Sequence, residues 1–397
     1  MKLYPGFKKE FDSETKRQLI QITYGDAFCY PLYYFIPSIT DDQKYIVYHR
    51  YEKDDVQLYA TDLQTGEVKK LTHANDDNPS WKIWCSPVKS GVLDHRSVLN
   101  TITNDVIYIE NNHVHTVNIN SLKDEILFSL ADDRRATGQN CVTPDGNWFV
   151  YIHTDLAQHN RISDFNNWDE YISNRHFAKQ AVLAGYNLKT GEHRDILILD
   201  GYFHHVFPYD NSNFILNHPP NESGMMLTSL EGSWYTHLRT QQRDGRKICH
   251  AGATSRGIVY EAASSHTDNI AGIYNPFNHR FFEFNLPENF GYTHTGIDPE
   301  GLLFYYENIN YEIPSREILN HDMYYLKSVL DNHCSFEKII GHRNTYGVLS
   351  QKSHFHPRMT ADRTHIVFTG GCDQSKTNHI YFADIEDLDK TEGIVYP

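Results

Sequence analysis

The hexapeptide Asp62-Leu63-Gln64-Thr65-Gly66-Glu67 returns later in the chain as Asn187-Leu188-Lys189-Thr190-Gly191-Glu192. Both copies join a short polar side chain, an apolar residue and a Thr-Gly turn, a combination typical of the turn that follows a β-strand. Weaker copies have the same kind of polar residue ahead of an apolar residue or proline. These copies are Asn118-Ile119, Ser229-Leu230, Asn275-Pro276, Ser328-Val329 and Asp384-Ile385. The sequence is therefore a tandem repeat of strand units.

Each copy of this signal follows a short apolar run with the pattern of a strand. Six intervals separate Asp62 from Asp384, so the period is about 54 residues, close to the length of a four-stranded propeller blade. Seven such units close radially into a ring that leaves only short, protected sheet edges. The seven runs are residues 45–48, 106–109, 148–151, 214–216, 258–260, 302–305 and 366–368. We therefore predict an all-β protein with the fold of a seven-bladed β-propeller.

The repeats fill the chain, which predicts a single propeller domain over residues 1–397. Residues 17–23 precede the first complete unit and are expected to form an N-terminal strand that closes the last blade. An inserted loop near residues 156–178 interrupts the third unit, and residues 165–172 within it have the pattern of a short helix. Such a loop is either a lid over a functional site or an insertion without a function, and the sequence favours neither. Two stacked β-sandwich domains are the alternative, but they do not require seven regular repeats.

Composition limits the possible partners. The chain carries a formal net charge of −15 and shows no stripe of lysine and arginine, which argues against nucleic acid or an anionic membrane as a partner. No run approaches the ~20 apolar residues of a membrane helix, and residues 1–10 lack the apolar stretch of a secretory signal. The six cysteines contain no CxxC pair, which fits reduced thiols. The sequence therefore predicts a cytoplasmic protein, in which an anionic substrate needs local cations.

Histidines recur at one phase of the repeat. Seven residues before the turn in each of the last four units lie His205, His250, His294 and His356. Histidine makes up 24 of the 397 residues, about 6%, so four in succession are improbable by chance. These positions belong to the innermost strand of each blade, which lies along the central channel. The pattern predicts a ring of channel histidines, either as a functional site or as packed and hydrogen-bonded side chains.

Possible metal ligands are dense around the last of these histidines. His354 and His356 alternate on a predicted strand, so their side chains point to one face. With Gln351 and the in-phase His294, they offer three imidazoles and an amide oxygen. This set lacks a thiolate, which favours Mn²⁺ or another divalent metal over a closed structural zinc site.

We expect different roles for the other two in-phase histidines. His250 would face the metal from one unit earlier, and its neutral imidazole suits a general base at cytoplasmic pH. A fourth metal ligand and a core histidine are the alternatives for this residue. His205 is expected to line the substrate cleft.

At these residues the chain resembles the oligogalacturonate lyases of polysaccharide lyase family 22, which are seven-bladed propellers. The resemblance runs from residues 32–35 in the first unit to Gln351, His354, His356 and Pro357 in the last. It implies that the Gln-x-x-His-x-His segment and His294 bind Mn²⁺, and that His250 is the catalytic base. It also implies β-elimination on a short anionic oligosaccharide of galacturonate, giving an unsaturated uronate at a late step of pectin degradation.

The resemblance has one departure. The family has an arginine in its fourth blade that is important to the reaction, and Met225 stands at that position in this chain. We therefore expect weaker activity on oligogalacturonate, or preference for a different uronide, and expect Met225→Arg to improve turnover. Arg358 is expected to bind substrate in place of the missing cation, with an exposed arginine of no such role as the alternative.

Three functions from other classes compete with a lyase. A non-catalytic propeller that binds a protein partner would make the histidines structural. A propeller-capped serine peptidase needs a hydrolase domain and a Gly-x-Ser-x-Gly motif. The chain is too short to carry that domain and its sequence does not contain the motif. A glycoside hydrolase needs a pair of carboxylates about 5 to 10 Å apart, and no inner-strand pair of Asp or Glu stands out.

Overall fold

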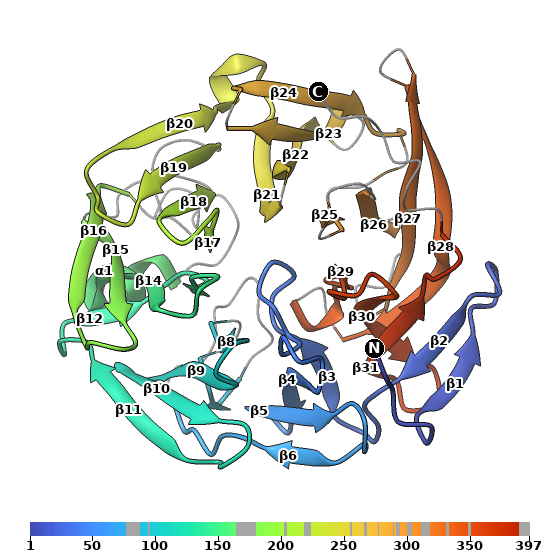
Figure 1. Ribbon diagram of the computed structural model, residues 1–397, viewed down its shortest axis with the longest axis horizontal. Helices are drawn as coiled ribbons and strands as arrows, with labels where there is room; N and C mark the ends of the chain where they lie inside the picture. Colours follow the sequence, from blue (N-terminus) through green and yellow to red (C-terminus); the bar gives the residue numbers. More distant parts are fainter. Residues whose placement is uncertain are drawn as a thin grey trace.

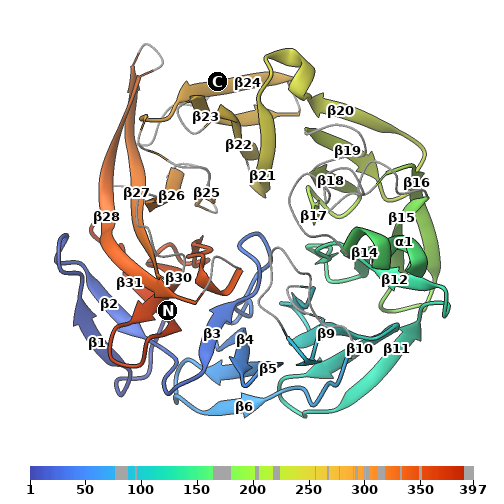
Figure 2. The same ribbon diagram turned by 180° about the vertical axis from the view of Figure 1, so that it is seen from behind.

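The computed structural model describes residues 1–76, 88–93, 96–163, 180–201, 205–217, 224–254, 256–265, 268–276, 278–288, 290, 294–298, 300, 304–310, 318–330, 333–347 and 351–388. Within these residues, seven antiparallel sheets are arranged as blades around a common centre (Figure 1). The view from behind shows the same ring (Figure 2). The predicted all-β, seven-bladed propeller is confirmed.

The first three blades follow one another along the chain. Blade 1 contains β3 (Phe28–Pro31), β4 (Tyr45–Glu52), β5 (Asp55–Asp62) and β6 (Val68–Lys70), with the short β7 (Ser90–Gly91) parallel to β5. Blade 2 contains β8 (Val98–Asn100), β9 (Asp105–Glu110), β10 (His113–Asn118) and β11 (Asp124–Ser129). Blade 3 contains β12 (Arg134–Ala136), β13 (Cys141–Val142), β14 (Trp148–Asp155), β15 (Ala181–Asn187) and β16 (His193–Leu199).

The next three blades have four strands each. Blade 4 contains β17 (His205–Pro208), β18 (Asn213–Asn217), β19 (Met225–Ser229) and β20 (Tyr235–Arg239). Blade 5 contains β21 (Lys247–Thr254), β22 (Gly257–Ser265), β23 (Asp268–Asn275) and β24 (Arg280–Asn285). Blade 6 contains β25 (Thr295–Ile297), β26 (Phe304–Asn310), β27 (Ile318–Leu330) and β28 (His333–Tyr346).

Blade 7 joins the two ends of the chain in one sheet. It contains β29 (Arg358–Met359), β30 (His365–Cys372), β31 (Thr377–Asp384), β2 (Gln18–Gln21) and β1 (Lys8–Phe11). β2 pairs antiparallel with β31, and β1 forms the outer edge, as Figure 1 shows. Backbone hydrogen bonds between distant parts of the sequence therefore close the ring.

The repeated hexapeptide has a local physical cause. Asp62 ends β5, and its Oδ1 accepts hydrogen bonds from the N–H groups of Gln64 and Thr65 at 2.8 and 3.0 Å. Asn187 ends β15 and makes the same two bonds. Gly66 completes the first of these turns at a φ of 77°, which disfavours a side chain. The polar residue therefore ends the third strand of a blade and starts the turn to the fourth.

Burial explains the apolar runs. They form the second strand of each blade, which has a neighbouring strand on both edges; of the run 302–305, residues 302–303 lie outside the described part. Ile46 and Val47 of β4 are both 0% exposed, because one packs toward each neighbouring blade. Side chains on both faces of a blade are thus buried between blades, which a continuous apolar run supplies.

Helical structure is sparse in the described residues. α1 (Leu156–Ser163) follows β14, and η1 (Gln241–Arg243) and η2 (Gln351–Ser353) are short 3₁₀ turns. Residues 164–179, which include the helix expected at 165–172, lie outside the described part. None of the described helices has the length and apolar character needed to cross a lipid bilayer. Cys29, Cys141, Cys334 and Cys372 are free thiols.

The connection between β3 and β4 fills the centre of the ring. Tyr33 and Tyr34 of this connection are 1% and 6% exposed although they belong to no strand. Their rings contact each other and Phe35 at centroid distances of 4.9 to 5.3 Å. This aromatic plug, residues 33–35, divides the central channel and provides a wall for the site described next.

Candidate metal centre

Strand register identifies an equivalent channel position in each blade from the second to the seventh. In blade 5, Gly252 of β21 pairs with Val259 of β22, and His250 lies two residues before Gly252. The same rule applied to the other blades gives Arg96, Gln139, His205, His294 and His356. The four in-phase histidines of the sequence therefore occupy equivalent places in the ring. Blade 2, which lacked a clear turn residue in the sequence, contributes an arginine.

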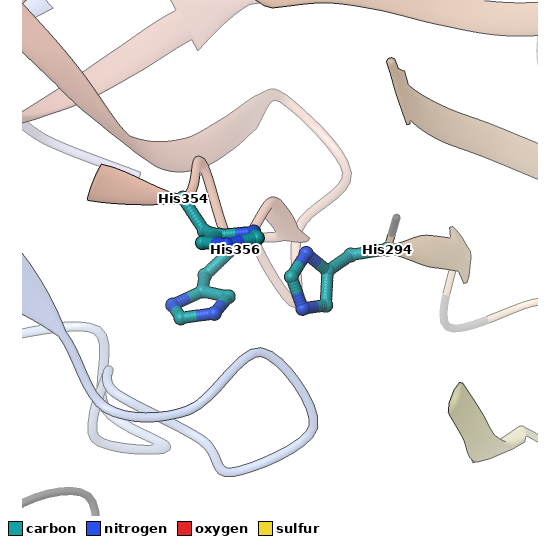
Figure 3. Close-up of side chains that lie close together, drawn as sticks. All are labelled: His294, His354 and His356. Atoms are coloured by element: carbon teal, nitrogen blue, oxygen red, sulfur yellow. The ribbon is translucent and has the colours of Figure 1, made fainter. Parts of the chain in front are cut away.

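The side chains of three histidines lie close together (Figure 3). The candidate ligand nitrogens of His294, His354 and His356 all lie within 4.8 Å of one another. The ring centroid of His294 is 4.5 Å from that of His356 and 5.2 Å from that of His354. His294 and His356 are each 1% exposed, whereas His354 is half-buried. The cluster therefore has a buried inner part and one member that solvent reaches.

The prediction that His354 and His356 alternate on a strand is wrong. β29 begins only at Arg358, and both histidines lie between η2 and β29. His356 has a φ of 47°, in the left-handed region that strand residues do not adopt. Phe355 anchors this segment, because its N–H donates to Oε1 of Glu307 at 2.8 Å. The two imidazoles still stack at a centroid distance of 5.7 Å, so they remain on one side of the chain.

A buried glutamate orients the inner histidine. Oε2 of Glu307 lies 2.7 Å from Nδ1 of His294, and Oε1 of Glu307 lies 2.9 Å from Nδ1 of His321. Burial alone would raise the pKa of this carboxyl, but the charges and hydrogen bonds of His294 and His321 hold it well below its usual range. An ionised carboxylate only accepts hydrogen bonds, so Nδ1 of His294 is the donor. Nε2 of His294 is buried and has no hydrogen-bond partner within the described ranges.

These donors fit a divalent cation. A histidine whose Nδ1 donates to a carboxylate, with Nε2 left available, is the usual arrangement of a metal ligand. Two nitrogens bound to one ion at about 2.1 Å are about 3 to 4 Å apart, so the 4.8 Å limit requires only small side-chain rotations. η2 places the backbone of Gln351 just before His354, while the side chain of Gln351 lies outside the described part. Gln351 as a ligand therefore stays a prediction.

Removing the charge of Glu307 is expected to weaken metal binding. Glu307→Gln replaces an acceptor by an amide that also donates, so Nδ1 of His294 loses its fixed orientation. Loss of such a partner typically lowers metal affinity by about 10- to 100-fold. The measurement is the dissociation constant of Mn²⁺ by calorimetry. Glu337→Gln is the matched control, because Glu337 is 45% exposed and pairs with Lys327 on the surface of blade 6. Equal affinities for the two variants would contradict the role of Glu307.

His250 lies next to the cluster, on blade 5. Its ring centroid is 4.4 Å from that of His294, and the side chain is half-buried. Its register partner on β22 is Glu261, which is 0% exposed. In blade 6, the N–H of Glu307 likewise donates to the carbonyl of His294 at 2.9 Å. Two adjacent blades therefore repeat one arrangement, a channel histidine with a buried glutamate on the next strand.

His205 lies beyond His250 in the ring and contacts the aromatic plug. Its Nε2 is 3.2 Å from the hydroxyl of Tyr33, and the two rings stack at 5.4 Å. Tyr33 also contacts His356 at 5.0 Å, and Tyr34 contacts His294 at 4.8 Å. The two tyrosines thus close one side of the space that the histidines surround. His205 is half-buried, and its place in a substrate cleft stays a prediction.

Arg358 lies apart from this cluster. It is half-buried, which excludes the alternative of an exposed surface arginine, and its Nη1 donates to the carbonyl of Tyr34 at 3.2 Å. It lines a cavity bounded by Tyr34 and Phe35, and none of the five histidines contributes to the lining. The structure therefore places Arg358 on the other side of the aromatic plug.

The prediction that Met225 stands at the substrate site is wrong. Met225 of β19 is 0% exposed and packs in the core between blades 4 and 5 with Phe207, Ile215 and Ile248. β19 is the third strand of its blade and does not border the channel. Its register partner is Arg239, which is itself buried and paired with Glu283. An arginine at position 225 would therefore enter the core and not the site.

Met225→Arg is accordingly expected to destabilise the protein without improving turnover. An uncompensated buried charge typically costs about 3 to 5 kcal/mol. Urea unfolding measures the loss, with Met225→Leu as the control because that swap conserves volume and usually costs less than about 1.5 kcal/mol. An arginine variant as stable as the leucine variant would show that position 225 reaches solvent.

Sequence reasoning missed Glu307, Glu261 and Arg96. The two glutamates share a signal, a Tyr-Glu pair inside a buried run, at Tyr260-Glu261 and Tyr306-Glu307. A carboxylate in a strand buried on both faces requires a partner, and this requirement points to them. The hydroxyl of Tyr306 donates to Oε1 of Glu261 at 3.1 Å, which links the two sites.

Comparison with known proteins places the fold. No protein-family model and no curated protein matches the chain. An oligogalacturonate lyase from Vibrio parahaemolyticus is 18% identical over 98% of each chain, with a TM-score of 0.76. An oligogalacturonate lyase in complex with manganese is 17% identical, over 98% of this chain and 99% of that one, with a TM-score of 0.77. A puromycin-hydrolyzing peptidase of Mycobacterium tuberculosis is 8% identical, over 93% of this chain but 53% of that one, with a TM-score of 0.55. Over almost its entire length, the chain is therefore similar in structure to oligogalacturonate lyases.

Proposed function

We propose that this protein is a metal-dependent lyase that cleaves short oligogalacturonides, or related uronides, by β-elimination. The observation that carries the proposal is the cluster of His294, His354 and His356 with a fourth imidazole, His250, 4.4 Å from His294. The likeness to two oligogalacturonate lyases, one of them in complex with manganese, supports it. Cytoplasmic action on fragments of pectin is part of the proposal.

His294, His354 and His356 would hold the metal ion, with Gln351 as a further ligand. A divalent metal held by these residues would supply Lewis-acid chemistry, stabilising the negative charge that develops on the uronate carboxylate. Glu307 fixes the tautomer of His294, so that Nε2 and not Nδ1 faces the site. The buried side of the cluster needs no rearrangement when the substrate arrives, because Glu307, His321 and Phe355 already hold it.

His250 would act as the general base. It takes the proton from C5 of the uronate, and the electron pair of that C–H bond becomes the C4–C5 double bond. The bond from C4 to the glycosidic oxygen breaks, and the departing oxygen takes up a proton. The products are an unsaturated uronate and a shortened saccharide. Tyr33 and Tyr34 exclude water from the inner side of the site, because both are buried against the histidines.

The charge of the substrate requires a cation besides the metal. The chain has a net charge of −15, so general attraction of an anion is absent. Arg96 is the cation among the channel positions, and its Nη2 donates to the carbonyl of Thr137 at 2.8 Å. Arg96 is 5% exposed, so it would act on the substrate mainly through the field of its charge and little through direct contact. We include Arg96 as the residue that favours a second uronate across the ring from the metal.

The direct test is an assay for the unsaturated product. Purified protein is incubated with Mn²⁺ and with di- and trigalacturonate, and the ultraviolet absorbance of the new double bond is followed. We expect a rise that depends on the metal and stops on chelation. A protein that binds metal yet gives no product with any uronide, galacturonate or other, would refute lyase activity. A protein that never binds metal would favour the non-catalytic propeller.

A further inference from the structure

A cavity lies beside the aromatic plug, and none of the five histidines lines it. Its volume is about 520 Å³, in the range of small-molecule sites. Tyr34 and Phe35 border it, and the inner strands of blades 2 to 7 form its walls beyond the histidine positions. It extends to the turns after the inner strands, where Asp41 and Pro144 are exposed. A small solute can therefore enter from the face that these turns form.

Arg358 is a cation of this cavity without a carboxylate partner among the described residues. Nη1 of Arg358 donates to the carbonyl of Tyr34, and no described carboxylate oxygen lies within 4.0 Å of its guanidinium. Asp298, which also lines the cavity, is paired with Arg363. Burial lowers the pKa of Arg358, an effect that only the Tyr305 hydroxyl opposes. A buried cation with so little compensation is unfavourable until an anion lies beside it.

A hydroxyl in the same cavity also lacks a partner. Thr295 opens β25, the inner strand next to β29, and it is 2% exposed. Its Oγ1 is buried and makes no hydrogen bond with any residue that the structure describes. Buried hydroxyls usually find a partner, so a missing one indicates a bound group. Arg358 and Thr295 thus line the same cavity from neighbouring blades, and each carries a hydrogen-bond donor.

The charges of the lining determine what kind of anion fits. One uncompensated arginine matches one carboxylate, which it can bind through two parallel hydrogen bonds. A phosphate dianion would bring a second negative charge into a cavity that also contains Asp41 and Asp298, and the described part of the lining holds no further cation to offset it. Apolar side chains, among them Val98, Leu99, Phe207 and Ile297, make up much of the remaining wall. An organic body attached to the carboxylate would pack against them.

We propose that this cavity binds a small organic monocarboxylate, held by the Arg358 guanidinium and the Thr295 hydroxyl, as a ligand site separate from the histidine cluster. The site uses no metal. It does not rest on lyase activity, since neither His250 nor the three clustered histidines line the cavity.

Calorimetric titration of the full chain, freed of metal with a chelator, tests the proposal. The monocarboxylate probes are D-galacturonate, lactate and benzoate, and galactose and inorganic phosphate are the comparison probes. We expect at least one monocarboxylate to bind with one-to-one stoichiometry, galactose not to bind, and phosphate to bind more weakly. The same titration of His354→Ala is expected to give the same affinity, which excludes binding at the histidines.

Substitutions locate the site. Arg358→Met is expected to weaken the binding of that monocarboxylate by about tenfold or more, as loss of a charge-assisted pair does, and Thr295→Val by a smaller factor. Arg256→Met is the control, because Arg256 is exposed and its Nε donates to the carbonyl of Glu300, outside the cavity. Arg358→Lys keeps the charge if the methionine variant fails to fold. The proposal is overturned if no monocarboxylate binds or if phosphate binds best. It is also overturned if Arg358→Met folds and binds the monocarboxylate with unchanged affinity. Where Arg358→Met does not fold, unchanged affinity in both Arg358→Lys and Thr295→Val has the same meaning.

Discussion

We expect His354→Ala to remove the proposed metal ion and, with it, nearly all of the proposed lyase turnover. His354 is the half-buried member of the cluster, so its loss disturbs the packing less than loss of His294 or His356, which are each 1% exposed. Two imidazoles and the predicted ligand Gln351 then remain, and we expect this set to hold a divalent ion poorly at micromolar concentration. Metal analysis should show the Mn²⁺ content falling from about one ion per chain to near zero. Turnover should fall by at least about 10³-fold, since a Lewis acid contributes several kcal/mol to the transition state.

His342→Ala is the informative control for this experiment. Ligand atoms of Glu14, Asp322 and His342 also lie within 4.8 Å of one another, which makes them a second candidate for a metal ion. However, Nζ of Lys338 lies 2.8 Å from Glu14 and 3.4 Å from Asp322, so a cation already neutralises these carboxylates. His342→Ala should therefore keep its metal. If His342→Ala loses the ion and His354→Ala retains it, the metal centre has been assigned to the wrong end of the molecule.

His250→Ala is expected to separate catalysis from metal binding. The imidazole of His250 is next to the cluster but is not one of its three clustered histidines, so the metal content should stay at the wild-type level. A general base typically contributes about 10²- to 10⁴-fold, and kcat should fall by that factor. KM should change little, because the base acts in the transition state and contributes little to substrate binding.

The pH profile gives an independent measure of the same residue. In the wild type, kcat should rise with pH as the base loses its proton, and this ascending limb should be absent from His250→Ala. Added imidazole should restore part of the rate by entering the vacated space. A variant that keeps near-full kcat, or one that loses its metal together with its activity, would show that His250 is not the base.

Local sequence determined the architecture. In three blades, the polar residue that ends the third strand (Asp62, Asn118 or Asn187) accepts hydrogen bonds from the N–H groups two and three residues later, so the turn after Asp62 is specified within six residues. The second strands are buried on both faces, and such strands need continuous apolar runs. Because each unit of the sequence contains an apolar run followed by a polar turn signal, the number of blades and the phase of His205, His250, His294 and His356 could be counted from the sequence. Their convergence then followed from the symmetry of a closed ring.

The chemistry of the site depended on contacts that sequence patterns do not contain. Glu307 reaches His294 and His321 within blade 6 but fixes Phe355 from blade 7, across an interface between blades. That contact helps hold the segment with His354 and His356 out of β29, which is why the expected strand did not form. Met225 was placed by its position relative to the family's arginine, yet it packs between blades. Arg358 was expected at the substrate because it lies two residues after His356, yet it lines a cavity to which none of the five histidines contributes. A repeat determines how far each residue lies from the axis of the ring and which position it takes within its blade, because both follow from strand pairing inside one unit. Which side chains share a buried space is decided by how neighbouring blades and the β3–β4 connection pack, and only the tertiary structure holds that information.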